Sequence, residues 1–324
     1  MTTVRFGHVL RRYGTVLGLA AIVAVFWVLR PNTFMTVGNW INITQQVSIL
    51  AVVAFASTVV MVTGAFDLSV GTLASLTGMV VASLMAGGLP IAAAIAAAIA
   101  VAAAAGTLNG LLVAYVRITP FVATLGTLTM FGGLALLVSS GNTIFGRAIP
   151  AAFGRFGRSG IPLGTVDDRP VMLPNLTLVA LAVLTLVFFL LEHTTFGRRL
   201  YALGGNPVAA RLSGVRVRLL TLLAFVVSGL GAGIGGLMLA SRLASANPSQ
   251  GDGLMLNAIA AVFLGVTMSE EGEPRVLGTL VGVLVLGVLA NGLTQLQINT
   301  YVQQVLTGAI IVTAVALGSL SRRT

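Results

Sequence analysis

The 324 residues of this chain are 57% hydrophobic and only 8% charged, whereas a soluble globular domain carries about 25% charged residues. This composition indicates a protein that crosses a membrane several times. The net charge of +10 comes from 18 arginines against eight acids, without lysine. These arginines are scattered between apolar runs rather than gathered on one polar face, which argues against a nucleic-acid-binding protein. The absence of cysteine excludes disulfides and thiolate metal sites.

Apolar runs that can cross a bilayer, which takes about 20 residues, occur ten times. The sequence therefore predicts an all-α bundle of ten transmembrane helices, forming a single membrane domain over residues 1–324. The first run is too long for a signal peptide and no small-residue cleavage site follows it, so we interpret it as an uncleaved span. The predicted spans are residues 14–29, 47–63, 68–86, 91–116, 121–138, 171–191, 219–240, 254–268, 276–296 and 301–317.

The distribution of arginine predicts the orientation, because cytoplasmic loops carry an excess of basic residues. An even number of spans puts both termini on one side. With both termini in the cytoplasm, twelve arginines are cytoplasmic and six external. The main exception is the outer loop, residues 139–170, which holds four of those six. This loop is rich in glycine and proline and shows no clear period, so we expect either an irregular cap on the outer face or a plain connector.

The central polar segment, residues 192–218, organises the chain. It holds five arginines against one acid, which indicates a cytoplasmic location. Asn206 and Pro207 can start a helix there, because asparagine is a good N-cap and proline suits the first helical position. Ser213 and Gly214 can end it. The sequence thus predicts a short helix that lies outside the bilayer.

Several predicted spans are rich in small residues. Residues 92–105 are nearly all alanine and isoleucine, residues 228–236 read SGLGAGIGG, and Gly278 and Gly282 repeat the four-residue spacing. Small residues let helices approach closely in lipid. We therefore expect these helices to pack against protein rather than lipid, and we assign these residues no chemistry.

Gly64 and Asp67 interrupt an apolar run of about forty residues in the stretch VTGAFDLSVGT (62–72). A carboxylate inside the membrane costs at least ~2.5 kcal/mol on insertion scales, so Asp67 needs compensating partners. It can cap a helix that starts at Leu68 by accepting from the amides of Ser69 or Val70. The alternative is that a broken helix near Asp67 lines a polar pathway.

Neutral polar side chains elsewhere in the spans can join such a pathway, and they suit a neutral solute with many hydroxyl groups better than an ion. Each of them, taken alone, is better explained by a helix–helix hydrogen bond. Enzyme signatures are absent, since no lysine can reach a phosphate and His8 and His193 are far apart in sequence. We expect no catalytic residue, no cofactor and no metal in this chain. The candidate pathway residues are Gln46, Asp67, Ser69, Thr124, Asn257 and Asn291.

Four stretches resemble the motifs of a known family, the ribose-type sugar ABC transporter permeases, which also include xylose, arabinose, galactose and autoinducer-2 permeases. The likeness runs from about residue 39 to the C-terminus, with the motifs in order and at family spacing. The stretches are GAFDLSVG (64–71), NGLLVAYVRITPFVATLGTL (109–128), TTFGRRLYALGGNPVAARLSGV (194–215) and GDGLMLNAIAAVFLGV (251–266).

The chain departs from the family pattern at two places. Residues 268–274 read MSEEGEP, with three acids, where the family often has a small, glycine-rich turn. Met255 and Asn257 stand where the family often shows acidic residues. These departures bear on the substrate and on the shape of the inner turn rather than on the architecture.

The resemblance implies a permease subunit in the bacterial cytoplasmic (inner) membrane, surrounded by lipid and paired with a second copy or a sister permease. It further implies a cytoplasmic ATPase with two fused nucleotide-binding cassettes, which binds the ATP, and an extracytoplasmic sugar-binding protein. Residues 206–214 would form the coupling helix that docks in the ATPase cleft, and residues 67–71 would lie close to the translocation path. The residues expected to couple are Gly204, Gly205, Asn206, Pro207, Ala209, Ala210, Arg211 and Gly214.

The expected function is therefore ATP-driven import of a pentose, hexose or related polyol-like solute, with this chain as the membrane subunit and not as an enzyme. The alternative is a secondary transporter of a small neutral solute that is coupled to protons or sodium. Asp67 would then be the ion site. A membrane-embedded enzyme is disfavoured because no nucleophile, base and orienting group converge in the sequence.

Overall fold

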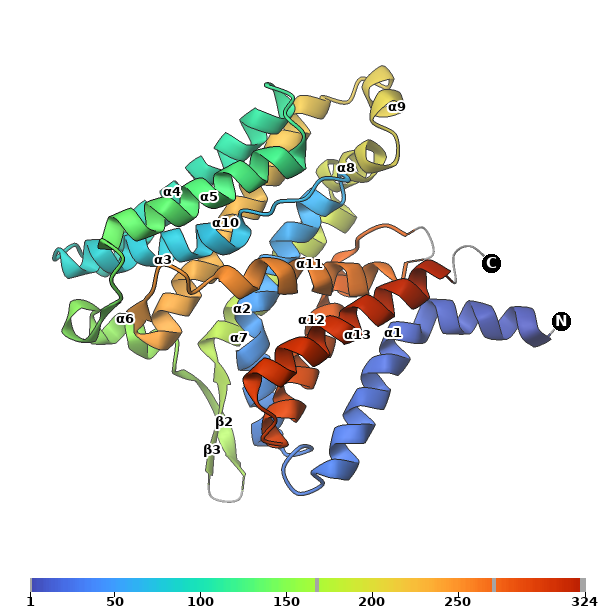
Figure 1. Ribbon diagram of the computed structural model, residues 1–324, viewed down its shortest axis with the longest axis horizontal. Helices are drawn as coiled ribbons and strands as arrows, with labels where there is room; N and C mark the ends of the chain where they lie inside the picture. Colours follow the sequence, from blue (N-terminus) through green and yellow to red (C-terminus); the bar gives the residue numbers. More distant parts are fainter. Residues whose placement is uncertain (1, 167–168, 270–271, 321–324) are drawn as a thin grey trace.

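The computed structural model of the protein describes residues 2–166, 169–269 and 272–320. Two acids of the inner turn, at positions 270 and 271, lie outside the described residues. Within those ranges the chain is an all-α bundle with short strands at one end (Figure 1). The α-helices are α1 (Thr2–Leu29), α2 (Val37–Met61), α3 (Val70–Ala86), α4 (Ile91–Ala114), α5 (Pro120–Ser139), α6 (Ala151–Phe156), α7 (Asn175–Phe188), α8 (Thr195–Gly205), α9 (Pro207–Leu212), α10 (Val217–Leu243), α11 (Asp252–Val266), α12 (Val276–Gln295) and α13 (Thr300–Leu320).

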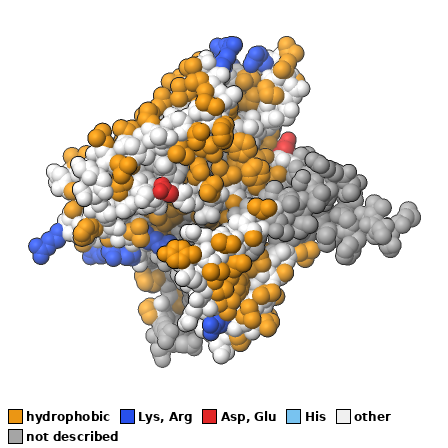
Figure 2. Space-filling model, viewed as in Figure 1, with side chains coloured by type: hydrophobic (Ala, Val, Ile, Leu, Met, Phe, Trp, Pro, Cys, Tyr) orange, Lys and Arg blue, Asp and Glu red, His pale blue; other side chains and the backbone are white. Residues whose placement is uncertain are grey.

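Each predicted span corresponds to one of these helices, which confirms an all-α membrane bundle. Six helices in the described part of the chain are long and apolar enough to cross a membrane: α2, α4, α5, α7 with the π-helical turn η2 (Phe189–His193), α10 and α12. The apolar helices α3 and α11 are shorter, with 17 and 15 residues. Hydrophobic side chains are spread widely over the face that Figure 2 shows, as expected of a surface in contact with lipid.

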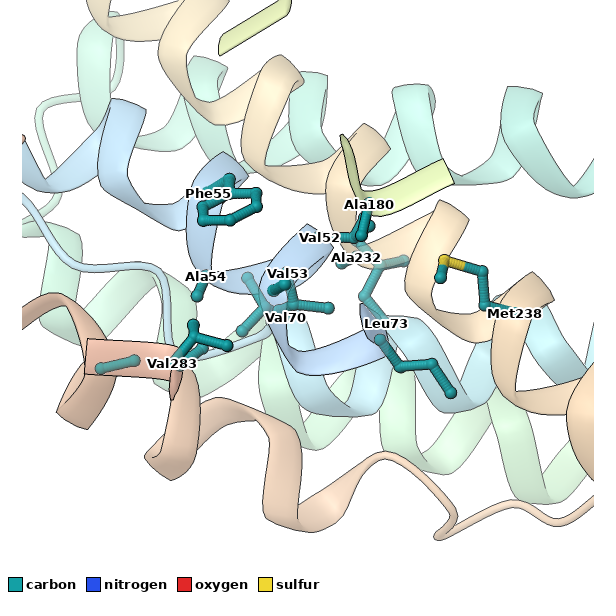
Figure 3. Packing of buried hydrophobic residues seen from close by; sticks show 14 of the residues in the cluster. Val52, Val53, Ala54, Phe55, Val70, Leu73, Ala180, Ala232, Met238 and Val283 are labelled. Atoms are coloured by element: carbon teal, nitrogen blue, oxygen red, sulfur yellow. The ribbon is translucent and has the colours of Figure 1, made fainter. Parts of the chain in front are cut away.

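The core surrounds α2, in which every residue from 51 to 61 is buried. Val52 of α2 lies close to Ala232 of α10 (Figure 3), and α2 also packs against α7, α11 and α12. Because α2 is apolar on all sides, it is enclosed by protein as the central helix of a large bundle.

Close helix contacts occur where glycines were expected to allow them. A Cβ atom on Gly229 of α10 would lie 2.7 Å from the Ala102 carbonyl oxygen of α4, and one on Gly282 of α12 would lie 2.0 Å from the Ala261 carbonyl oxygen of α11. Helix α4, which contains residues 92–105, packs closely against α10 along one face. Alanine at every fourth position there forms one buried face, and several of the other alanines are exposed.

The loop at residues 139–170 is not an irregular cap. It contains the helical turn η1 (Gly146–Ala148), α6 and strand β2 (Gly160–Val166), which pairs with β3 (Arg169–Pro174) in an antiparallel hairpin. Two-residue strands, β1 (Ile144–Phe145) and β4 (Ser245–Ala246), also pair. The sixth span was predicted to start too early, at 171, because the apolar residues 171–174 belong to the hairpin. The helix begins only after Pro174, whose ring fixes the backbone at the helix start.

The two ends of the bundle differ. The β2–β3 hairpin lies at the bottom of Figure 1, whereas α8 and α9 lie at the top, and α1 begins and α13 ends at the right. The Thr15 hydroxyl of α1 is 2.6 Å from the Thr267 hydroxyl, which directly follows α11. The start of the α1 span therefore lies beside the end of the α11 span.

Candidate functional site

The chain is irregular between α2, which ends at Met61, and α3, which begins at Val70. Gly64 adopts a φ of +80°, a conformation that favours glycine, and residues 65–67 have no regular secondary structure. The break predicted near Asp67 is therefore present. The helix start predicted at Leu68 is two residues early, because a turn over 68–69 precedes the first helical residue.

The Asp67 carboxylate is buried and accepts three hydrogen bonds. Its Oδ1 accepts from the Ser69 amide at 3.0 Å and from the Ser69 hydroxyl at 2.6 Å, and its Oδ2 accepts from the Ser228 hydroxyl at 2.8 Å. The predicted hydrogen bond from the Ser69 amide is present, but it precedes α3, whose N-cap is Ser69, so Asp67 does not cap that helix. Ser228 was assigned to helix packing alone, which was wrong, since it lies on α10 and ties that helix to the break.

The hydrogen bonds continue into two further helices. The Asn109 side-chain amide of α4 donates to the Ser69 hydroxyl at 2.8 Å, and the Thr127 hydroxyl of α5 donates to Asn109 Oδ1 at 2.7 Å. We call Asp67, Ser69, Asn109, Thr127 and Ser228 the Asp67 network. All five residues are buried. The network joins the break to α4, α5 and α10.

The Asp67 network lies inside the bundle. Ser228 is the twelfth residue of α10, so it lies about 16 Å along the axis from the helix start at a rise of about 1.5 Å per residue. Unpaired polar groups at such a depth are costly, so mutual hydrogen bonding explains how they are accommodated.

A second break separates α10 from α11, at residues 244–251, and meets the first. The Gly251 amide donates to the Ser75 hydroxyl of α3 at 2.8 Å. A Cβ on Gly71 would lie 2.7 Å from the Gly251 carbonyl oxygen, and one on Gly251 would lie 2.1 Å from the Gly71 carbonyl oxygen. The starts of α3 and α11 thus touch backbone to backbone, so only glycine fits at either position.

The six predicted pathway residues divide into two groups. Asp67 and Ser69 belong to the network, and the Thr124 hydroxyl lies beside it, 3.4 Å from the Phe66 carbonyl oxygen. The other three lie on separate helices and outside the network. Gln46 is half-buried on α2, Asn257 is exposed on α11, and Asn291 is buried on α12, where it accepts from Gln295.

The short helix predicted after Asn206 is confirmed as α9. Asn206 Oδ1 accepts from the amides of Val208 and Ala209, both at 3.0 Å. The helix ends at Ser213, followed by Gly214 with a φ of +79°. The preceding helix α8 was not predicted, although its buried residues Gly197, Leu200 and Leu203 recur every three positions. The eight residues expected to couple, from Gly204 to Gly214, lie between the end of α8 and the turn after α9.

One face of α9 is held by protein and another is open. Ala210 is buried, whereas Val208 is 67% exposed and Leu212 is 83% exposed. In Figure 2 basic side chains gather at the top of the molecule, at the end that carries α8 and α9 in Figure 1. The open face of α9 therefore combines exposed apolar side chains with nearby positive charge.

Helix α8 rests directly on the first break. A Cβ on Gly204 would lie 2.0 Å from the carbonyl oxygen of Val62, the residue that follows α2. A Cβ on the adjacent Gly205 would meet nothing within 4 Å. The end of α8 thus touches the segment that leads to Asp67.

A polar cluster joins α8 to the start of α12. The Tyr201 hydroxyl lies 3.2 Å from Glu192 Oε1 and 3.3 Å from the Pro274 carbonyl oxygen, and Arg275 pairs with Glu192 at 3.4 Å. Burial, reinforced by the Glu192 carboxylate, raises the pKa of the Tyr201 hydroxyl. This hydroxyl therefore remains a hydrogen-bond donor at physiological pH.

Comparison with known proteins bears on the function of these features. The sequence model of a family described as "branched-chain amino acid transport system / permease component" matches residues 39–315. The chain is 40% identical to the ribose import permease protein RbsC of Bacillus subtilis (strain 168), over 97% of this chain and 94% of that protein.

Two further relatives come from Escherichia coli (strain K12). The chain is 36% identical to the D-allose transport system permease protein AlsC, over 95% of this chain and 92% of that protein. It is 33% identical to the galactose/methyl galactoside import permease protein MglC, over 96% of this chain and 95% of that protein. No solved structure matches the chain. The chain therefore belongs to this permease family, as a multi-pass protein of the bacterial inner membrane whose relatives are the ribose-type sugar ABC transporter permeases.

Proposed function

We propose that this chain is the membrane-spanning subunit of an ABC importer for a sugar, a pentose, hexose or related polyol-like solute. The names of its relatives and the neutral hydroxyl and amide groups near the break support this substrate class. The chain holds no cofactor of its own. ATP is bound by a partner ATPase with two fused cassettes, and an extracytoplasmic binding protein delivers the solute.

The proposed topology has ten spans with both termini in the cytoplasm. Helices α1, α2, α3, α4, α5, α7, α10, α11, α12 and α13 alternate in direction, which puts α8 and α9 on the cytoplasmic side and the β2–β3 hairpin outside. The arginine count supports this orientation.

The observation that carries the proposal is the short exposed helix α9. Val208 and Leu212 are apolar side chains that lie outside the spans and point away from the bundle, since Ala210 on the opposite face is buried. Such residues fit a partner's groove better than open solvent. We propose that α9 docks in the ATPase cleft, with Gly205 and Pro207 at its edge.

Movement of α9 would reach the spans by two contacts. The first is Gly204 against Val62, which leads into the break and the Asp67 network. The second is the cluster of Glu192, Tyr201 and Arg275, which leads to the start of α12. Both contacts act on segments that lie between helices. Movement of such segments can shift the bundle between inward-open and outward-open states with little repacking of the helix interiors.

The translocation path would pass the meeting point of the two breaks, because discontinuous helices expose backbone polar groups where a polar solute needs them. Asn257 is an exposed polar residue of α11. The exposed side of α11 would face a second permease copy across the path. A binding site shared by two copies or two sister chains follows from this placement.

The test is reconstitution in lipid with the partner ATPase and binding protein. ATP hydrolysis should rise when solute-loaded binding protein is added, and it should rise less with empty binding protein. Failure of the ATPase to associate would contradict the proposal. If uptake instead follows a proton or sodium gradient in the absence of ATP, the chain is an ion-coupled secondary transporter.

A further inference from the structure

A pocket of about 400 Å³ opens between the end of α4 and the start of α10, which are cytoplasmic in the proposed topology, on which this inference rests. Its wall combines three arginines with a tyrosine and two aliphatic side chains, and no acidic residue contributes to it. The three guanidinium groups are exposed. Among the described residues none of them has an acidic partner within 4 Å; the ion pair of this part of the chain joins two other residues, Arg275 and Glu192. The lining residues are Tyr115, Arg211, Arg216, Val217, Arg218 and Leu219.

The level of the pocket in the membrane follows from the helices that form it. Tyr115 directly follows the last residue of α4, and Val217 is the first residue of α10, both of which are long apolar helices. The pocket therefore lies where the hydrocarbon layer ends and the head groups begin. Tyrosine is the residue type typical of that layer. Tyr115 and Leu219 are 48% and 40% exposed, which gives the pocket an apolar side next to the acyl chains.

We propose that this pocket binds the phosphate of an anionic phospholipid of the inner leaflet. Guanidinium groups bind phosphate oxygens in a bidentate manner, and basic pockets between the cytoplasmic ends of transmembrane helices suit anionic head groups. The apolar side of the pocket favours a lipid over a free anion, because a free phosphate has no use for it.

The pocket is distinct from the docking face of α9. The exposed apolar residues Val208 and Leu212 are not part of its lining, and only Arg211 belongs to α9. A lipid held there would bridge α4, α9 and α10. It would hold α9 against the membrane surface and leave Val208 and Leu212 free to dock in the ATPase cleft.

The experiment is native mass spectrometry of the full-length chain in detergent, titrated with phosphatidylglycerol or phosphatidylcholine. The double variant Arg216→Gln/Arg218→Gln should bind phosphatidylglycerol about 30-fold more weakly, given roughly fivefold per surface arginine. The control variant Arg147→Gln/Arg155→Gln removes two exposed arginines from the outer loop and should bind as the unchanged chain does. Phosphatidylcholine should bind equally weakly to all three.

Four results would overturn the proposal. The first is equal binding of phosphatidylglycerol and phosphatidylcholine, and the second is an equal loss of phosphatidylglycerol binding in the control variant. The third is displacement of the lipid by inorganic phosphate at millimolar concentration. The fourth is that the double glutamine variant keeps its lipid binding but loses the ATPase when the complex is purified. The last would assign the pocket to the ATPase. If the glutamine variant does not fold, Arg216→Lys/Arg218→Lys keeps the charge but loses the bidentate geometry. It should show intermediate affinity, and full affinity would contradict phosphate binding by the guanidinium forks.

Discussion

Replacing Gly204 by alanine tests the contact between α8 and the first break. The new Cβ would lie 2.0 Å from the Val62 carbonyl oxygen, so the contact must open by about 1.5 Å to reach the usual non-bonded separation of about 3.5 Å. Overpacking of this kind costs about 1–3 kcal/mol. If the contact exists in one transport state only, the equilibrium between the states shifts by about 5–150-fold.

The assay compares uptake and ATP hydrolysis in proteoliposomes that contain the complete transporter. Gly204→Ala should lower uptake at least about fivefold, the lower end of that range, and should weaken the stimulation of ATP hydrolysis by loaded binding protein. Gly133→Ala in α5, outside the proposed docking segment, is the control. Its Cβ meets nothing within 4 Å, and alanine favours the helix by up to about 1 kcal/mol, so uptake should be unchanged. Equal activity of the two variants would refute the proposed contact route.

Other substitutions test the remaining parts of the account. Ser228→Ala leaves Asp67 Oδ2 without its hydrogen-bond donor and should lower the stability of the folded protein by about 1–3 kcal/mol. Ser241→Ala removes a hydroxyl from an uncharged carbonyl oxygen and should lower it less. The thermal unfolding midpoints in detergent measure both losses, and equal losses would contradict the role given to the carboxylate. Gly205→Arg places a long cationic side chain in the proposed docking groove, so transport should be lost. Membrane insertion, measured by membrane fractionation, should stay intact. Full transport by this variant would exclude docking at this position. Asp67→Asn should leave uptake dependent on ATP and insensitive to ionophores. If uptake by the unchanged chain depends on an ion gradient and the variant loses that dependence, Asp67 is the ion site of a secondary transporter.

The elements that the sequence predicted well are those that local chemistry determines. Asn206 and Pro207 carry the signals for a helix start, and α9 begins where they place it. Hydrophobic length alone located the apolar helices. The hairpin at residues 160–174 was missed because its glycines and prolines masked the strand pattern, while pairing across the turn determined the structure.

The candidate site was predictable only in part. Asp67 was singled out because a carboxylate inside an apolar run needs a partner, and its bond to Ser69 is local. Ser228 and Asn109 are far from Asp67 in sequence, so the helix arrangement alone brings them to the break. The contact of Gly71 with Gly251 depends on the same arrangement, since nothing in either stretch indicates the other.

Cysteine labelling tests directly whether the segment containing α9 faces the cytoplasm, because the chain has no cysteine. Leu212→Cys lies on α9 at a position 83% exposed, and Leu163→Cys lies on β2 at a position 60% exposed. A membrane-impermeant maleimide should label Leu212→Cys in inside-out vesicles only and Leu163→Cys in right-side-out vesicles only. Labelling of Leu212→Cys from the outside would contradict both the topology and the coupling of this chain to a cytoplasmic ATPase.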